Sequence, residues 1–406
     1  MAPKGALRVL ERLNAAGFEA YFVGGCVRDI LRGAAPHDWD ICTAARPEEA
    51  AQCFDSARVR FTGRRHGTIT VLEDGMPYEI TTFRVDGAYS DGRRPDQVRF
   101  VSRLEEDLAR RDFTMNAIAM DASGGMRDPF GGQADIKNHI IRCVGVPNLR
   151  FQEDGLRVLR ALRFASVLDF RMEEETAGSV RHSSGRLACV AAERIQEELR
   201  KLLLGRAVGR VLLEYGDVLC AVWREFCSVV FAPELWGRTV RALERSAPEL
   251  PVRLTLLLFG LEKDADVRGL LDRLRFDAET ARLVSQLTAL SHVRLEPEDK
   301  VLRRWLKELG LGKLRLLLAV QRGAAETQAE EKRVDEVSAR VAAILEEGQC
   351  FSREMLAVDG RDVTAAGIAQ GPAVGRVLDL LLEQVMDGVL PNDRARLLSV
   401  LAGLDV

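Results

Sequence analysis

Histidines and paired cysteines are scarce in this 406-residue chain. It contains five histidines, and its eight cysteines include no Cys-x-x-Cys motif. Structural zinc sites need four cysteine or histidine ligands at short spacings, so the sequence argues against one. We expect the cysteines to be reduced, small apolar residues of a cytoplasmic protein.

Strong net charge and long apolar runs are missing as well. The net charge of −3 creates no global basic field, so any RNA binding must come from local patches. No uninterrupted apolar run is long enough to span a membrane, and the amphipathic start of the chain lacks a signal-peptide core. The composition, 47% hydrophobic and 29% charged, is typical of a soluble protein with room for several domains.

The order of the predicted elements indicates an α+β fold. Apolar and β-branched segments favour strands at residues 21–23, 57–62, 68–72 and 78–84, and we expect a further strand over residues 136–144. From about residue 150, apolar residues recur every three or four positions, which is typical of helices. Strands in one block and helices in the next predict a mixed head followed by an all-helical remainder.

Residues 21–43 hold the most informative pattern. Gly24 and Gly25 end a short strand and precede a predicted helix, so backbone N–H groups can approach a phosphate closely there. Asp38 and Asp40 follow two residues apart, and on a strand both carboxylates point to the same face. Two close carboxylates are costly unless a cation lies between them. Oxygen ligands beside a phosphate site indicate Mg²⁺.

At these residues, Gly-Gly-x-Val-Arg-Asp followed by Asp-x-Asp, the chain resembles a known family. It is similar to the class II tRNA nucleotidyltransferases and bacterial poly(A) polymerases, which are polymerase-beta-like nucleotidyltransferases. The resemblance is strong over residues 20–205. It implies a catalytic head with a mixed, mainly antiparallel sheet (1–145), a helical neck with the nucleobase-selecting motif (146–205), a helical body (206–330) and a helical, tRNA-binding tail (331–406).

Glu79 is a candidate third carboxylate of the metal site. It lies in a predicted strand that we expect beside the strand of Asp38 and Asp40. From the residues alone it is equally an outward-facing strand acid. The resemblance favours the metal site, because relatives have a third acid near this position.

Arginines are concentrated between residues 84 and 111. The turn-rich centre of this segment is either a solvated loop or a mobile segment that covers the nucleotide and contacts phosphates. It resembles the flexible loop of the family, which accompanies the final A addition. The residues singled out at this centre are Tyr89, Asp91, Arg93 and Arg94.

A helix is predicted to begin at Arg110 and Arg111. Cations at the start of a helix do not suit its dipole, and this misfit suggests that Arg111 faces an anion or a sugar hydroxyl. The matching family motif contacts the ribose of the incoming nucleotide. Asp112 and Asn116, one helical turn apart, would brace the site.

Residues 151–165 contain charged residues spaced by threes: Asp154, Arg157, Arg160 and Arg163. Such a stripe is commonly a solvated helix face, but three arginines in a row repel one another unless an anion such as a triphosphate meets them. Asp154 and Arg157 offer an acceptor beside donors, which matches cytosine and adenine and leaves guanine and uracil unpaired. The family motif Glu-Asp-x-x-Arg is read in this way. Gly155 stands where relatives usually have proline.

These features predict a cytoplasmic CTP(ATP):tRNA nucleotidyltransferase that builds or repairs the 3′-terminal CCA of tRNA. The alternatives are an A-adding enzyme, a poly(A) polymerase, and a tRNA-binding protein that has kept the fold. The expected site comprises Asp38 and Asp40, with Glu79, for two Mg²⁺ ions; Gly24, Gly25, Arg28, Arg160 and Arg163 around the triphosphate; Arg111 at the ribose, with Asp112 bracing this nucleotide-binding group; and Asp154 and Arg157 at the base.

Overall fold

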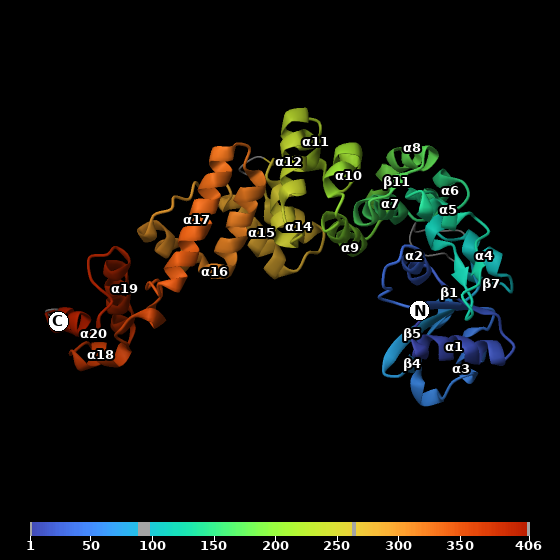
Figure 1. Cartoon of the computed structure of the whole chain (residues 1–406), viewed down its shortest axis with the longest axis horizontal. Coiled ribbons are helices and arrows are strands. Elements are labelled where there is room, and N and C mark those ends of the chain that lie inside the picture. The colour runs from blue at the N-terminus through green and yellow to red at the C-terminus, as the bar shows by residue number, and fades with distance from the viewer. Residues whose placement is uncertain (1, 88–97, 262–264, 404–406) are drawn as a thin grey trace. The chain divides into compact units, whose positions relative to one another are not determined.

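The computed structural model describes residues 2–87, 98–261 and 265–403. Tyr89, Asp91, Arg93 and Arg94 lie outside these ranges. The chain forms two compact units: Met1–Phe231 with Arg273–Arg275, and Ala232–Asp272 with Phe276–Val406 (Figure 1). The boundaries predicted at residues 145, 205 and 330 do not coincide with the division into these two units, and they stay predictions.

The first unit begins with a seven-stranded mixed sheet in the order β3-β4-β5-β2-β1-β8-β9. Strands β2 and β5 pair in parallel and every other neighbouring pair is antiparallel, so the predicted mainly antiparallel sheet is confirmed. Helix α1 (Lys4–Ala15) packs across β1, β4 and β5. The strands are β1 (Ala20–Val23), β2 (Asp40–Thr43), β3 (Val59–Gly63), β4 (Thr68–Glu73), β5 (Met76–Thr82), β8 (Ala119–Met120) and β9 (Met126–Arg127).

Short elements surround this sheet. Helix α2 (Gly25–Leu31) follows β1, α3 (Pro47–Gln52) follows β2, and the two-stranded sheet of β6 (Arg84–Asp86) and β7 (Val98–Phe100) precedes α4 (Leu104–Ala109). The strands predicted at residues 21–23, 57–62, 68–72 and 78–84 are all present, displaced by at most about two residues.

The strand predicted over residues 136–144 is wrong. Helix α5 (Gly132–Lys137) occupies its first part, and only β10 (Ile140–Ile141) is extended, pairing in parallel with β11 (Arg171–Met172). The reason is a cap that lies before the apolar run. The Asp128 carboxylate accepts the backbone N–H groups of Gly132 (2.7 Å) and Gln133 (2.9 Å), and this satisfies donors that the first helical turn leaves unpaired.

The helix predicted to begin at Arg110 is also wrong. Helix α4 ends at Ala109, and only Thr114–Asn116 forms a short 3₁₀ turn further on. Arg110 and Arg111 therefore follow the C-terminus of a helix, where the dipole favours cations. The expected conflict with the dipole does not exist, so any functional role of Arg111 depends on its contacts.

From residue 147 onward the chain is almost entirely helical, as predicted. Helix α7 packs against α9 and α10, and Figure 1 shows these helices in green beyond the sheet. The helices of this part are α6 (Pro147–Glu153), α7 (Leu156–Leu168), α8 (Glu174–His182), α9 (Ala192–Leu203), α10 (Val208–Tyr215) and α11 (Cys227–Val230).

The second unit is helical and has two hydrophobic clusters. One joins α15, α16 and α17, and the other joins α18, α19 and α20. Gly310 interrupts α16 with φ = 73°, so two straight segments meet there at a kink. The helices are α12 (Pro233–Arg245), α13 (Leu250–Leu258), α14 (Val267–Arg273), α15 (Ala278–Leu290), α16 (Asp299–Ala324), α17 (Gln328–Glu346), α18 (Gly360–Ala365), α19 (Pro372–Met386) and α20 (Arg394–Ala402).

All eight cysteines lie in the described ranges, and all are free thiols. Among the helices of the described ranges, none combines the length and apolarity that a membrane span requires.

Candidate active site

Acidic side chains are gathered where strand β2 begins. Because β2 and β5 run parallel with Asp40 in register with Glu79, the two neighbouring side chains point to the same face of the sheet. The predicted position of Glu79 on an adjacent strand is confirmed. Asp38 lies just before β2, separated from Asp40 by the buried ring of Trp39, which packs edge-on against Phe22 with the ring centroids 5.0 Å apart. Trp39 anchors this segment while both acids remain exposed.

The pKa of Asp40 shows that these charged groups interact electrostatically. Desolvation raises the pKa of Asp40 above its ordinary value, the charges of Glu79 and Asp38 raise it further, and the charge of Arg111 opposes the shift. Carboxylates that disfavour one another's ionised forms become easier to ionise when a cation joins them.

The donor set fits a hard divalent cation. Asp38, Asp40 and Glu79 offer only carboxylate oxygens, which Mg²⁺ prefers. Over residues 2–87, 98–261 and 265–403, no group of three or more His, Cys, Asp or Glu side chains is arranged to hold an ion by itself. Mg²⁺ commonly uses one or two carboxylates and takes its other ligands from water and substrate phosphates, so the open arrangement suits it.

Gly24 brings the chain close to these acids. Its φ of 81° and ψ of −130° suit glycine. A Cβ atom at this position would lie 3.4 Å from Nη1 of Arg111 and 3.9 Å from Oδ2 of Asp40. Helix α2 begins at the next residue, Gly25, whose own Cβ would lie 3.7 Å from Nη2 of Arg28. The two predicted glycines therefore lie between the acids and the first arginines.

Asp107, which the sequence patterns did not single out, holds Arg111 beside this turn. Nη2 of Arg111 donates to Oδ2 of the fully buried Asp107 (3.1 Å). Its Nε is buried and has no hydrogen-bond partner in the described part of the chain. Asp107 also accepts from Arg110 (2.8 Å), so one carboxylate orients both arginines. The available signal was an acidic residue on the side of α4 that packs against the core. Burying an acid is costly unless a cation pairs with it.

A continuous polar network connects helix α2 with helix α7. Nη1 of Arg28 donates to the amide oxygen of Asn116 (2.9 Å), and Nδ2 of Asn116 donates to Oδ1 of Asp112 (3.0 Å). Oδ2 of Asp112 accepts from Nε (2.8 Å) and Nη2 (2.6 Å) of Arg160. Asp112 and Asn116 brace the arginines, as expected. Burial disfavours the charge of Asp112, but Arg160 and Asn116 outweigh it and lower its pKa far below the ordinary value.

Helix α9 completes the network. The buried Glu198 accepts from Nε of Arg163 (2.7 Å) and lies 3.5 Å from Nη1 of Arg160. Arg160 and Arg163 of the α7 stripe are therefore neutralised by carboxylates from two other segments. Sequence spacing revealed the arginines and missed Glu198, although it lies in the amphipathic segment 192–200.

One aromatic ring lies among the same arginines. The Phe164 ring centroid is 5.1 Å from the guanidinium carbon of Arg28, 5.4 Å from that of Arg160 and 3.6 Å from that of Arg163. The ring is 3% exposed and packs edge-on against Phe113 at 5.7 Å. The electron-rich face of an aromatic ring attracts cations, so Phe164 helps to hold three like charges together.

The two residues of the predicted base-reading pair have different partners in the structure. Asp154 lies in the break between α6 and α7 rather than on α7, and its carboxylate accepts from Arg194 at 2.7 and 3.2 Å. Arg157 donates to Glu153 (2.6 Å) and to the backbone carbonyl groups of residues 150 and 110. Each member of the pair is thus oriented by a different partner.

The mixed sheet, the adjacent carboxylates and the arginine-lined glycine turn define a nucleotidyltransferase. Family models agree: residues 20–142 match the poly A polymerase head domain, 169–215 a probable RNA- and SrmB-binding site of polymerase A, and 252–401 a putative tRNA nucleotidyltransferase domain 2. The CCA-adding enzyme of Levilactobacillus brevis is 38% identical over 394 residues, which are 96% of this chain and 95% of that enzyme. The chain belongs to the family of CCA-adding enzymes.

Other relatives agree along the whole chain. The CCA-adding enzyme of Geobacillus kaustophilus is 36% identical over 402 residues, 97% of this chain and 95% of that one. The crystal structure of the Bacillus stearothermophilus CCA-adding enzyme in complex with CTP matches 99% of this chain and 97% of its own, with a TM-score of 0.78 and 32% identity. The Thermotoga maritima CCA-adding enzyme complexed with tRNA_CCA shares the fold, with a TM-score of 0.70 and 21% identity over 98% of this chain and 95% of that one.

Proposed function

We propose that this chain is a CTP(ATP):tRNA nucleotidyltransferase that adds or repairs the 3′-terminal CCA of tRNA without a nucleic-acid template. The observation that carries the proposal is the meeting of Asp40, Glu79, Gly24 and Arg111 at one end of the sheet. Phosphate-binding and carboxylate groups are both needed for nucleotidyl transfer, and here they are adjacent. The tRNA substrate supports a cytoplasmic location for this activity.

The acids are proposed as ligands of Mg²⁺. Asp38 and Asp40, with Glu79 beside them, would hold two ions, which when bound activate the 3′-hydroxyl and stabilise the leaving pyrophosphate. The raised pKa of Asp40 supports this role, because a site that disfavours its own negative charge gains most from a cation.

The cationic residues are proposed to bind the rest of the nucleotide. The backbone at Gly24 and Gly25 and the side chains of Arg28, Arg160 and Arg163 would hold the triphosphate. In the absence of nucleotide, Asp29 balances Arg28, and Asp112 and Glu198 balance Arg160 and Arg163. They thus keep the guanidinium groups oriented without leaving an unpaired buried charge. Arg111 would lie towards the ribose, and Asp112 would brace the nucleotide-binding arginines.

Asp154 and Arg157 are proposed to select the base. The Asp154 carboxylate would accept the amino group of cytosine or adenine, and Arg157 would donate to the adjacent ring nitrogen. Uracil and guanine present the reverse pattern, and a mismatched polar group in a protein site is rejected strongly. Fixed partners, Arg194 and Glu153, support this role because they restrict the rotation of both side chains.

Incorporation of labelled CTP and ATP into three tRNA transcripts tests the proposal. The transcripts lack CCA, end in C or end in CC, and the Asp40→Asn variant serves as the inactive control. We expect C, C and A to be added in order to the first transcript. ATP added only to the CC-ending transcript would instead establish an A-adding enzyme, and long A tails a poly(A) polymerase. Tight tRNA binding without any incorporation would refute the enzymatic function.

A further inference from the structure

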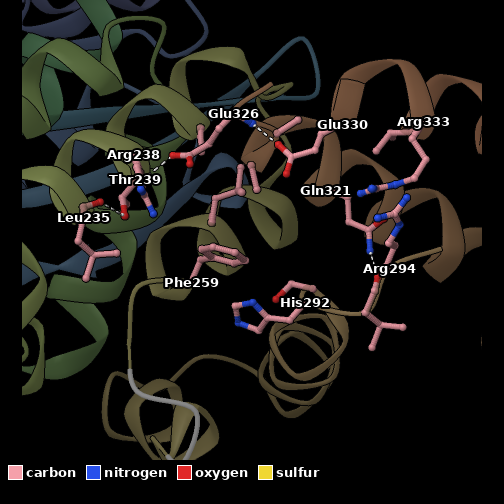
Figure 2. Close-up of a pocket in the computed structure, with 17 residues that line it drawn as sticks. Leu235, Arg238, Thr239, Phe259, His292, Arg294, Gln321, Glu326, Glu330 and Arg333 are labelled. Atoms are coloured by element: carbon pink, nitrogen blue, oxygen red, sulfur yellow. Dashed lines mark hydrogen bonds and ion pairs between the residues drawn. The ribbon is translucent and has the colours of Figure 1, made fainter. Parts of the chain in front are cut away.

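The second unit contains a cavity of about 300 Å³. It lies between α12, α13, the segment after α15, and the junction of α16 with α17 (Figure 2). This volume is at the lower end of the range for small-molecule sites, which is enough for a mononucleotide. All of its lining residues belong to the second unit, whereas all proposed catalytic residues belong to the first.

A pair of flat rings forms one wall of the cavity. Phe259 and His292 pack with ring centroids 4.6 Å apart and an interplanar angle of 33°, and Figure 2 shows both rings on the same side of the cavity. Phe259 is half-buried and His292 is exposed, so an aromatic ligand can stack on the imidazole. The amide of Gln321 donates to the carbonyl of Val293 (2.7 Å) and holds the segment that carries His292 in place.

The opposite side of the cavity carries positive charge. Figure 2 shows the side chains of Arg294 and Arg333 converging there beside Gln321. Among the described residues, the ion-pair partner of Arg294 is Glu296 on the surface (2.6 Å), a contact of low energy in water. Within the described ranges, Arg333 forms no ion pair at 4 Å or less. Two converging guanidinium groups without a shared carboxylate favour an anion between them.

The acidic residues that line the cavity already have partners within the protein. Glu326 pairs with Arg238 (2.9 Å). Glu330 accepts the backbone N–H groups of Glu326 (2.8 Å) and Thr327 (3.1 Å), and these hydrogen bonds, with a smaller contribution from the charge of Arg333, lower its pKa. Its charge thus stabilises the start of α17. The cavity therefore keeps an excess of positive charge on the Arg294 and Arg333 side.

We propose that this cavity binds a nucleotide, with its base stacked on His292 and its phosphate held by Arg294 and Arg333. The junction of α16 with α17 supplies one of the two arginines, Arg333. The ligand is either a free mononucleotide or a nucleotide of the bound tRNA, since both present a base and a phosphate. A stacked base with a basic groove is a general mode of nucleotide binding.

Photo-crosslinking of labelled 8-azido-AMP to the full-length protein, with the adducts mapped by peptide mass spectrometry, tests the free-nucleotide source. We expect adducts on the peptides that contain Phe259 or His292. They should be lost in Arg333→Gln and in His292→Ala and kept in Arg322→Gln. The last variant removes the same charge from the end of α16, but Arg322 faces Asp335 and does not line this cavity.

Filter binding of a tRNA transcript to the same proteins tests the RNA source. If the cavity takes a nucleotide of tRNA, Arg333→Gln and His292→Ala should raise the Kd about tenfold and Arg322→Gln should not. Absence of AMP adducts at the cavity, together with wild-type tRNA affinity in both variants, would overturn the proposal. Incorporation of CTP and ATP at saturating tRNA is a separate readout, which we expect to remain at the wild-type level in both variants.

Discussion

Replacing Phe164 by leucine should weaken the binding of both nucleoside triphosphates. The ring contacts Arg28, Arg160 and Arg163 at 5.1, 5.4 and 3.6 Å, and these are the arginines proposed to hold the triphosphate. Leucine keeps an apolar side chain in the same position but has no aromatic face. The three guanidinium groups then keep their carboxylate partners and lose the ring that draws them together.

The expected loss of free energy in Phe164→Leu follows from these contacts. One cation–π contact contributes about 0.5–2 kcal/mol, with larger values where the groups are desolvated. The side chains of Arg28, Arg160 and Arg163 are 12%, 31% and 14% exposed, so each contact is partly desolvated. Because the three contacts share one ring, we expect about 1.5–3 kcal/mol in all, not their full sum. If half of this, about 0.75–1.5 kcal/mol, appears in substrate binding, KM rises about fourfold to tenfold.

Steady-state incorporation with CTP and with ATP is the assay. Asp154 and Arg157, which are proposed to select the base, are unchanged in this variant, so the KM values for both nucleotides should rise together and the ratio of C to A addition should not change. Phe113→Leu is the matched control. Phe113 is equally buried and packs on Phe164, but within the described residues it contacts no cation. Equal KM values in the two variants, or a wild-type KM in Phe164→Leu, would refute the reasoning.

Three further outcomes are expected. Asp40→Asn should lower incorporation at least about a hundredfold because a metal-site carboxylate is lost, with the thermal unfolding midpoint no lower than in wild type; substantial residual activity would contradict this. Gly155→Ala should destabilise the protein by about 1–3 kcal/mol in urea unfolding, because the new Cβ would lie 2.9 Å from the backbone oxygen of Arg186; an unchanged midpoint would argue against the close contact. The pKa of Asp112 is lowered in the folded state. Its pairing with Arg160 therefore stabilises the fold fully above about pH 4, and this stabilisation is lost as the pH falls towards the folded-state pKa. The difference in thermal unfolding midpoint between wild type and Asp112→Asn should shrink between pH 6 and pH 3. A constant difference would show that Asp112 is not ionised in the pair.

Local patterns were sufficient for much of the fold and for the centre of the site. The strand that ends at Gly24, the following helix and the alternation around Trp39 depend on neighbours within a few residues. Such short-range preferences act before tertiary contacts form. The same holds for the change from strands to helices near residue 147. Two predicted elements were wrong. At residues 136–144 the helix cap formed by Asp128 outweighed the apolar strand pattern, and at Arg110 the preceding helix ends instead of a new one beginning.

The partners of the site residues were decided only by the tertiary structure. Asp112 and Arg160 are 48 residues apart in sequence, and Asp154 and Arg194 are 40 apart. A lone arginine or acid in a sequence does not specify which opposite charge it will meet, because pairing depends on packing between segments. Sequence alone therefore determined which chemical groups this protein brings to its site and the local segments that carry them. Their pairing, burial and shifted pKa values exist only once the sheet and helices α7 and α9 pack together, since desolvation and Coulomb energies depend on distance in space.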